Sequence, residues 1–530
     1  MNMFSIFGEL SFSTVLISFL IIIFLYRYSI RSHNYWKERN VPFVKPYPFI
    51  GTLLDIVTKP GHEVELERYL KYGPIYGHFE TNKPMLSVGD PSILRNILVK
   101  DIQVFQGNRF SETGNKELDN MITMAKGENW KRIRTIISPT FSTGKMKRMM
   151  GIFRDCCETL MNNLAKVAEQ GETFDAKRVF GAFTLDVIAS SAFSTKLDSQ
   201  QDPNNKFVRM ASKLFSPGFN WRLVGVVLFP KLMKLMGESF FSSESLNFFS
   251  RVTYQIIDER RRTGKTANDF LQLLLDTCKE VESNGQLKQS FEEVDDLTTN
   301  YGAGMEDNQA LLQNPVTKSL STDEMVSQCV VFFLAGYEST STTLSIACYF
   351  MALHPDIQEQ AYAEVKQLLQ DSGDVISYES VQKMKYLDSI IAETLRLYPP
   401  AFRIERMAEA DYTLGDTGIT ISKGTIVTIP IYALHRDPRY FPNPYKFDPD
   451  RFSSKERSDR DSLVYIPFSA GPRNCVAMRF ALLEMKICLA HLLRKFEVKT
   501  CAQTKEKLEF QMRQPMLQPK EIILKLKLRN

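Results

Sequence analysis

The chain has 530 residues, of which 44% are hydrophobic and 24% charged, and its formal net charge at pH 7 is +5. This composition is typical of a globular protein and excludes a disordered or fibrous chain, and so small a net charge gives no indication of nucleic-acid binding. The eight scattered cysteines follow neither the spacing of a zinc site nor that of a disulfide framework, so they are expected to be reduced thiols.

The first predicted element is an uncharged apolar stretch at residues 10–26, whose length is at the short end for a membrane-spanning helix. A cleaved signal peptide would have basic residues before the stretch and small residues at a cleavage site. Here Glu9 precedes the stretch and four basic residues follow it within 27–39. We therefore predict an uncleaved single-pass anchor at 10–26, which by the positive-inside rule places residues 1–9 in the lumen and the rest of the chain in the cytosol.

A basic and then proline-rich segment at 27–51 follows the predicted anchor. Its prolines fix φ and remove backbone donors, which favours a stiff extended linker. Residues 52–530 are predicted to form one large domain that is mainly α-helical with a small β region. Its first β element is a hairpin at 75–88, where an alternating pattern is interrupted by the turn residues 82–84.

The next informative segment begins a helix at Gly127. Trp130 and Arg134 lie four residues apart on one face of this helix, so an indole N–H and a guanidinium converge. Residues 145–260 have mainly helical patterns, and within them the apolar stretch 221–236 either contacts a membrane surface or forms a buried helix pair. Residues 279–314 then become polar and acidic, which is typical of a solvated connection.

A long apolar helix is predicted at 321–353, where a capping-box pattern opens it and a proline ends it. In its middle, Ala335 and Gly336 allow another group to approach the backbone closely, and Glu338 and Ser339 follow. The simplest interpretation of the two polar residues is a partly exposed charge and a hydroxyl that bonds back to its own helix. The alternative is a functional pair of an acid and a hydroxyl.

Further along the chain, Glu393 and Arg396 lie three residues apart on one helix face, where most such pairs are surface ion pairs of small energy. An alternating strand pattern follows at 420–429. The turn-rich sequence 443–452, which contains Arg451, comes next.

The most specific motif is the loop 467–475, with the sequence PFSAGPRNC, which precedes a helical pattern at 478–495. Cys475 follows Arg473 and comes just before the helix amides, so its thiol is expected to titrate low and to act as a thiolate ligand for a metal. The simpler alternative is a structural cysteine, because free cysteines are among the most buried residues.

The spacing of Phe468, Gly471, Arg473 and Cys475 resembles the haem-ligating loop of the cytochrome P450 family. Four more segments match motifs in the family's order, namely 130–134, 335–339, 393–396 and 449–452. The resemblance covers the chain from the anchor to near its end. It is strongest to the microsomal branches that oxidise xenobiotics and steroids in animals.

Two positions depart from the family's pattern. Ser339 replaces a threonine, which keeps the hydroxyl but loses the methyl group that restricts χ1, so we expect working but leakier oxygen activation. Ala477 replaces a glycine two residues after the cysteine, and its added methyl is expected to shift the haem packing slightly without preventing binding.

The resemblance also implies roles for individual residues. Cys475 would ligate the iron of haem b, and Glu338 and Ser339 would route protons to bound O2. The remaining cofactor-binding residues implied by the resemblance are Trp130, Arg134, Arg406, Arg473, Phe468 and Gly471. The residues of a buried structural lock would be Glu393, Arg396 and Arg451, and those facing the substrate would be Leu334, Ala335, Phe402 and Ile404.

The implied activity is that of a haem-thiolate monooxygenase, which inserts one oxygen atom of O2 into a lipophilic substrate by hydroxylation or epoxidation. Its electrons would come from NADPH through a flavoprotein reductase, and cytochrome b5 would be a further candidate partner. The protein would lie in the endoplasmic reticulum membrane, in contact with lipid. The candidate reductase-docking residues are Lys131, Arg132, Lys145, Lys147 and Arg148, although ordinary solvated charge explains them equally well.

Two other functions stay open at this stage. One is a reductase-independent haem-thiolate isomerase of fatty-acid peroxides, which would not need the pair of Glu338 and Ser339. The other is a membrane-anchored haem protein without turnover, suggested by the departures at Ser339 and Ala477. NADPH consumption coupled to product formation distinguishes these from the monooxygenase.

Overall fold

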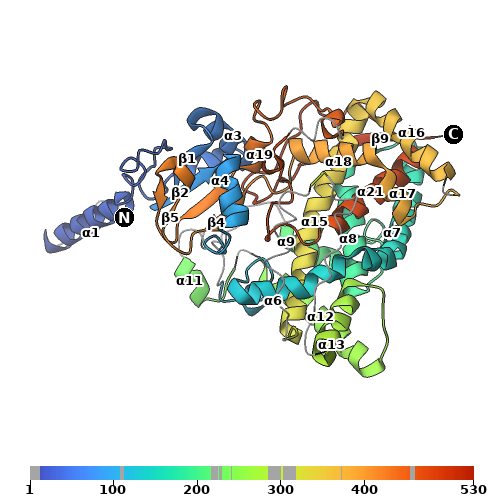
Figure 1. The fold of residues 1–530 in the computed structure, drawn as a ribbon, viewed down its shortest axis with the longest axis horizontal. Helices are drawn as coiled ribbons and strands as arrows, with labels where there is room; N and C mark the ends of the chain where they lie inside the picture. The colour runs from blue at the N-terminus through green and yellow to red at the C-terminus, as the bar shows by residue number, and fades with distance from the viewer. Residues whose placement is uncertain are drawn as a thin grey trace, which may run out of the picture.

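The computed structural model describes residues 12–107, 113–215, 222, 225, 230–239, 241–284, 300–301, 318–371, 373–453 and 460–529. The predicted luminal segment 1–9 and most of the acidic connection 279–314 lie outside the described residues. Helices form most of the body, and the strands gather mainly at the side nearer to the N-terminus (Figure 1). The prediction of a mainly α-helical domain with a small β region is confirmed.

The helices follow the apolar periodicities of the sequence and start, in several cases, at a polar side chain that caps the first turn, as Asp90, Asp175 and Ser321 do. Their bounds are α1 Phe12–Ile30, α2 Leu54–Thr58, α3 Gly61–Tyr72, α4 Pro91–Arg95, α5 Lys116–Asp119, α6 Gly127–Ile137, α7 Thr143–Glu169, α8 Ala176–Phe193, α9 Lys206–Phe215, α11 Pro230–Leu235, α12 Ser243–Thr263, α13 Phe270–Asn284, α15 Thr322–Leu353, α16 Pro355–Asp371, α17 Tyr378–Lys383, α18 Lys385–Leu397, α19 Ile431–Leu434 and α21 Met478–Lys495. A π-helical turn, Asn96–Lys100, follows α4, and short 3-10 turns lie at Ser138–Phe141, Gly415–Thr417, Pro449–Phe452 and Ser462–Val464.

The long helix α15 runs through the middle of the molecule (Figure 1). Ser321 and Glu324 form the predicted capping box, and the helix ends at Leu353 before the proline at 355. Nearly all of its side chains from Met325 onward are buried, because α8, α12, α18 and α21 pack around it. It therefore provides a rigid wall against which other elements position their side chains.

The strands form three small sheets. The largest has the order β1-β2-β7-β4, in which β1 and β2 are the predicted hairpin, β2 pairs parallel with β7, and β7 pairs antiparallel with β4. The other two sheets have the orders β3-β9-β8 and β5-β6. The strand bounds are β1 Ile75–Glu80, β2 Lys83–Val88, β3 Thr173–Asp175, β4 Ile404–Met407, β5 Tyr412–Thr413, β6 Thr420–Ile421, β7 Ile426–Ile429, β8 Phe496–Lys499 and β9 Ile523–Leu528.

The N-terminal helix α1 projects away from the body (Figure 1). It covers most of the predicted anchor at 10–26 and continues to Ile30, and its apolar side chains from Val15 to Tyr28 are exposed. Among the described residues, no helix meets the length and hydropathy needed to cross a membrane.

Residues within the predicted linker 27–51 pack onto the domain. Trp36 is fully buried, and its indole Nε1 donates to the His78 carbonyl at 3.3 Å. The Val44 amide donates to the Gly77 carbonyl at 2.9 Å, which attaches the proline-rich part to β1.

The structure describes only part of the apolar stretch 221–236, because Trp221 and residues 223–224 and 226–229 lie outside the described set. Its last part forms α11, in which Leu232 and Leu235 are exposed and Met233 is buried, and Met236 after the helix is exposed. Membrane contact and a buried helix pair therefore both stay predictions for this stretch.

Candidate active site

Cys475 lies on the loop before α21. Backbone contacts on the side of the loop away from the cavity fix its shape. The Cys475 amide donates to the Phe468 carbonyl at 2.9 Å. Gly471 has φ of +69°, and a Cβ there would lie 2.0 Å from the Leu98 carbonyl oxygen, so only glycine fits. Phe468 and Gly471 therefore shape the loop without lining the cavity in front of it.

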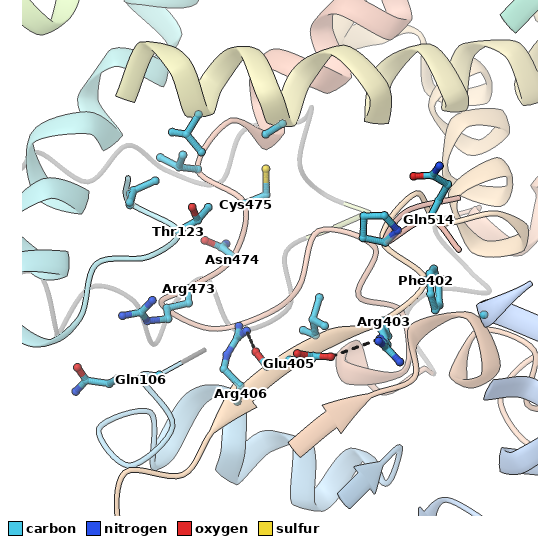
Figure 2. A pocket seen from close by; sticks show the side chains of 18 of the residues that line it. Gln106, Thr123, Phe402, Arg403, Glu405, Arg406, Arg473, Asn474, Cys475 and Gln514 are labelled. Carbon is cyan, nitrogen blue, oxygen red and sulfur yellow. Dashed lines mark hydrogen bonds and ion pairs between the residues drawn. The ribbon is translucent and has the colours of Figure 1, made fainter. Parts of the chain in front are cut away.

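The Cys475 sulfur points into a cavity of about 790 Å³, on the side where α15 runs (Figure 2). Burial raises the pKa of the Cys475 thiol, whereas the Ala477 amide and the Arg134 charge act in the lowering direction. The expected low pKa is therefore contradicted for the thiol itself, because desolvation by the surrounding cavity wall outweighs the Ala477 amide and the Arg134 charge. A metal at the sulfur would displace the proton.

Three arginines from different parts of the chain line the same cavity, and Figure 2 shows two of them beside Cys475. Arg134 comes from α6, Arg406 from β4 and Arg473 from the loop. Each has a buried Nε without a hydrogen-bond partner. Burial lowers the pKa of Arg134 and Arg406 to about 10 and that of Arg473 to about 9. Within the described residues, none of the three pairs with a carboxylate, so the cavity has an uncompensated positive charge.

The other atoms of these guanidinium groups are held by the protein. Arg134 donates from Nη1 and Nη2 to the backbone and side-chain oxygens of Asn474, at 2.8 and 2.7 Å. Arg473 donates to the Ala125 carbonyl at 2.9 Å and stacks on the Trp130 ring at 4.5 Å. Arg406 donates to Ser469 Oγ at 3.3 Å. The predicted set of Trp130 and three arginines is thus brought together around one space.

The predicted acid and hydroxyl on α15 occupy different surroundings. Glu338 is buried and points to α8, where its Oε1 accepts from Lys177 Nζ at 2.5 Å, and it is not among the residues that line the cavity. The Ser339 hydroxyl donates to the Ala335 carbonyl at 2.7 Å. Ala335 does line the cavity, so the serine lies next to its wall.

Three of the four residues expected to face the substrate line the cavity, and one does not. Ala335, Phe402 and Ile404 line the cavity. Leu334 does not, because its side chain is buried in the main hydrophobic core on another face of α15.

The predicted structural lock is assembled behind the loop. Arg396 donates from Nε and Nη2 to the two carboxylate oxygens of Glu393 at 2.6 and 2.8 Å, and both side chains are fully buried. Arg451 Nε lies 3.6 Å from Glu393 Oε1. Arg396 also donates to the His435 and Pro444 carbonyls at 2.8 Å, so the pair ties α18 to the segments that precede the loop.

A protein-family model described as cytochrome P450 matches residues 41–308 and 305–526. The chain belongs to the cytochrome P450 family. The two parts of the match meet at 305–308, inside the connection between α13 and α15, and the match begins within the predicted linker 27–51.

Relatives cover nearly the whole chain. It is 36% identical over 526 residues to cytochrome P450 3A25 of Mus musculus, an alignment that covers 98% of this chain and 97% of the relative. It is 35% identical over 530 residues to cytochrome P450 3A7 of Homo sapiens, with 98% of both chains covered. The lithocholate 6-beta-hydroxylase of Mesocricetus auratus is 36% identical over 524 residues, which cover 98% and 97% of the two chains. The expected resemblance to the branches that oxidise xenobiotics and steroids is confirmed.

Members of this family use haem, and the cavity of this P450 fits that group. A thiol suits the iron, and three buried Nε–H groups without partners suit the propionates, which are anionic and accept hydrogen bonds from guanidinium groups. Cys475 would hold the iron, while Trp130, Arg134, Arg406 and Arg473 would surround the propionates. Ala477 also lines the cavity, and its φ of −95° is one that alanine adopts without strain.

The basic residues considered for reductase docking lie on α6 and α7. Lys131 pairs with Glu128 at 2.7 Å, Arg132 pairs with Glu324, and Lys147 pairs with Glu379 at 2.6 Å. Arg148 donates to Asn268, and Lys145 is half-buried. Most of these residues thus already have a partner within the chain.

Sequence reasoning did not find several residues of the site. Lys177, which holds Glu338, lies far from it in sequence, on a helix whose pattern looks ordinary. Asn474 was part of the recognised loop but had no predicted partner. Gln106, Thr123 and Gln328 line the cavity as well, and only the tertiary arrangement brings them there.

Proposed function

We propose that this P450 is a haem-thiolate monooxygenase that inserts one oxygen atom of O2 into a lipophilic substrate, by hydroxylation or epoxidation, with haem b held on Cys475. The observation that carries the proposal is one cavity lined both by Cys475 and by three arginines whose buried Nε–H groups have no hydrogen-bond partner. Bound haem supplies O2 activation, and a thiolate ligand favours cleavage of the O–O bond.

The residues of the chain would bind, orient and deliver protons. Arg134, Arg406 and Arg473 would each donate their free Nε–H to a propionate, and Trp130, on whose ring Arg473 stacks, would donate its indole N–H. Ser339 holds a proton at Oγ beside the cavity wall, and Glu338 would supply protons to it. The Glu338 carboxylate lies on the side that faces α8, where Lys177 Nζ and Thr342 Oγ1 donate to its Oε1 at 2.5 and 3.3 Å, so this transfer would require the carboxylate to turn toward Ser339.

The substrate is proposed to be a bulky apolar molecule. Residues such as Ile50, Ile56, Met85, Phe402 and Pro515 form a mainly apolar wall around the cavity. The name of the relative from Mesocricetus auratus says that it hydroxylates lithocholate. Lithocholate is therefore a suitable first probe for this chain.

Membrane attachment and electron supply belong to the same proposal. The exposed apolar side chains of α1 support an anchor through residues 10–26 in the endoplasmic reticulum membrane, with the domain in the cytosol. NADPH would supply electrons through a flavoprotein reductase docked near α6 and α7, with cytochrome b5 as a further candidate. Carbonate extraction of microsomes, compared between the full chain and a variant lacking residues 1–30, tests the attachment.

The decisive experiment is the carbon monoxide difference spectrum of the reduced protein. We expect the red-shifted band of a thiolate-ligated haem in the wild type and its loss in Cys475→Ser. Absence of the band in a wild-type protein that retains haem would contradict the assignment of Cys475.

A second measurement tests turnover. The purified protein with added reductase should consume NADPH in proportion to hydroxylated lithocholate or to another oxidised lipophilic probe. Rearrangement of a fatty-acid hydroperoxide without NADPH would favour the isomerase instead. A normal carbon monoxide spectrum with neither reaction would favour a haem protein without turnover.

A further inference from the structure

Residues 120–126, between α5 and α6, form a turn over the cavity and are held largely by side chains from elsewhere. Ile122 and Thr123 of this turn line the cavity, and Figure 2 shows Thr123 near Asn474 and Cys475. The turn has few backbone bonds of its own, such as those from Met124 and Ala125 to the Met121 carbonyl at 2.9 Å. Its position over the cavity therefore depends on the residues that suspend it.

Two of the side chains that hold the turn bind to its C-terminal end. Arg473 of the cysteine loop donates to the Ala125 carbonyl at 2.9 Å, and Gln106 accepts from the Gly127 amide at 2.8 Å. Both hold the turn where it enters α6. Neither reaches the residues at its tip that cover the cavity.

Gln328 of α15 holds the other end. Its Oε1 accepts from the Ile122 amide at 2.9 Å, and its Nε2 donates to the Asn120 carbonyl at 2.7 Å and to the Glu324 carbonyl at 3.0 Å. The side chain is fully buried and lines the cavity. Its amide oxygen and both amide protons are thus used, and all the bonds except the one to Glu324 fix the turn to the helix.

We propose that Gln328 is a positioning residue that sets which ligands fit above Cys475, by fixing the distance of Ile122 and Thr123 from the opposite wall. Gln328 lies two helical turns before Ala335, on the same face of α15. The same helix thus carries Ala335, which lines the cavity, and Gln328, whose side-chain amide fixes the position of the turn over the cavity. This inference rests on the proposed haem site and extends it to ligand selection.

The physical reason for the effect is the cost of an unsatisfied buried group. Replacing Gln328 by methionine keeps the volume but leaves the Ile122 amide and the Asn120 carbonyl without partners. The turn can restore these bonds to water only by moving away from α15. Such a movement changes the space above Cys475 while leaving Cys475, Arg134 and Arg406 untouched.

The first test measures amide hydrogen exchange in the full-length protein as purified, which does not depend on the haem proposal. In Gln328→Met, exchange of the peptide containing Ile122 should accelerate about tenfold, since one lost buried hydrogen bond is worth about one order of magnitude in a local equilibrium. The matched control is Ser327→Ala, one residue earlier, because the buried Ser327 hydroxyl bonds only within α15, to the Asp323 carbonyl at 2.9 Å. Unchanged exchange in Gln328→Met would overturn the proposal, since the turn would then be held without it.

The second test uses two nitrogen ligands that bind haem iron and differ in size. Imidazole is small and does not extend to the turn, whereas 4-phenylimidazole carries a ring that must fit beneath Ile122 and Thr123. The ratio of their two spectroscopic Kd values should change about threefold or more in Gln328→Met, by the size of a repacked apolar contact, and stay constant in Ser327→Ala. An unchanged ratio would overturn the proposal.

The two tests separate this inference from the proposed function. If the wild-type protein gives no spectral response to either ligand and no carbon monoxide band, the haem proposal fails, and hydrogen exchange alone decides whether Gln328 positions the turn. If both ligands bind but the ratio does not respond, the haem proposal stands and the role of Gln328 in ligand selection is wrong.

Discussion

Lys177 of α8 and Glu338 of α15 form a buried ion pair, with Lys177 Nζ 2.5 Å from Glu338 Oε1. Lys177 Nζ also donates to Ser341 Oγ at 3.0 Å and to Thr342 Oγ1 at 3.1 Å. The acid expected to route protons is therefore held by a cation and by one hydroxyl, that of Thr342, on the side of α15 that faces α8. Glu338 thus joins α15 to α8, and the proton exchange that we propose for it would be a second, separable task.

Replacing Lys177 by methionine tests the first task. Glu338 would keep a buried charge without its counter-ion, so we expect a loss of about 3 to 5 kcal/mol in the free energy of unfolding, measured by urea titration. The double variant Lys177→Met with Glu338→Met should recover most of this loss, because no unpaired charge stays buried. A single variant as stable as the wild type would show that water reaches Glu338.

The proton-routing task is tested by the coupling of NADPH consumption to product formation in Glu338→Gln.

The three cavity arginines should matter for haem rather than for folding. Arg473→Gln removes a buried cation that has no carboxylate partner among the described residues, so the apoprotein should unfold at the same or a slightly higher urea concentration. Haem should leave about tenfold faster, because a charge-assisted hydrogen bond contributes about 1.5 to 3 kcal/mol. Transfer of haem to apomyoglobin measures this rate. The control is Arg494→Gln, which removes an exposed arginine paired with Asp374 at the surface. Equal haem loss in both variants would contradict the assignment of Arg473.

Asp186 predicts a pH dependence of stability. Burial raises the pKa of this carboxyl from 3.8 to about 7, although the Ser199 amide and hydroxyl donate to it. The native state therefore binds more protons than the unfolded state between about pH 4 and 7, and the free energy of unfolding should fall as pH rises through this range and level off above it.

The variant Asp186→Asn isolates this contribution. It should be more stable than the wild type at pH 8 and should lose that part of the pH slope, as measured by urea unfolding at pH 5 and pH 8. The matched control is Asp155→Asn, whose carboxylate is half-exposed and paired with Lys196. If the two variants have the same difference between pH 5 and pH 8, Asp186 is not protonated in the native protein.

The sequence was informative where a motif resembles one of the family. The resemblance predicted a role for Gly471, which fits beside the Leu98 carbonyl only without a side chain, and a buried pair of Glu393 and Arg396, for which helical spacing alone would have indicated a surface ion pair. The helix at 478–495 was predicted with its bounds because its apolar periodicity is continuous. The hairpin was predicted with its outer bounds, 75–88, but its turn is shorter than the predicted 82–84, because Lys83 and Pro84 belong to β2. The alanine at 477 departs from the family pattern, and the backbone there does not need glycine, because its φ of −95° is negative.

The parts that could not be predicted depend on contacts between distant segments. The partner of Glu338 is 161 residues away, and the amides that Gln328 holds are more than 200 residues away. No local periodicity encodes such pairs. The prediction of a low pKa for Cys475 was wrong for a related reason. The burial that raises this pKa comes from elements that only the fold brings around the loop.

The connection between α13 and α15 supplies the last prediction. Tyr301 is buried, and its ring lies 5.4 Å from that of Phe468 in an edge-to-face arrangement, while the neighbouring Asn300 donates to Asp388. Because the Phe468 carbonyl accepts from the Cys475 amide, Tyr301 supports the cysteine loop from behind. In Tyr301→Ala, the thiolate-type carbon monoxide band should convert to the thiol-type band several-fold faster in mild urea, and Tyr301→Phe should behave like the wild type, since the ring contact is kept. The control is Tyr349→Ala, an equally buried tyrosine whose hydroxyl bonds to the Lys505 and Glu506 carbonyls. If Tyr349→Ala accelerates the conversion as much as Tyr301→Ala, the effect is general destabilisation, and Tyr301 has no specific role at the loop.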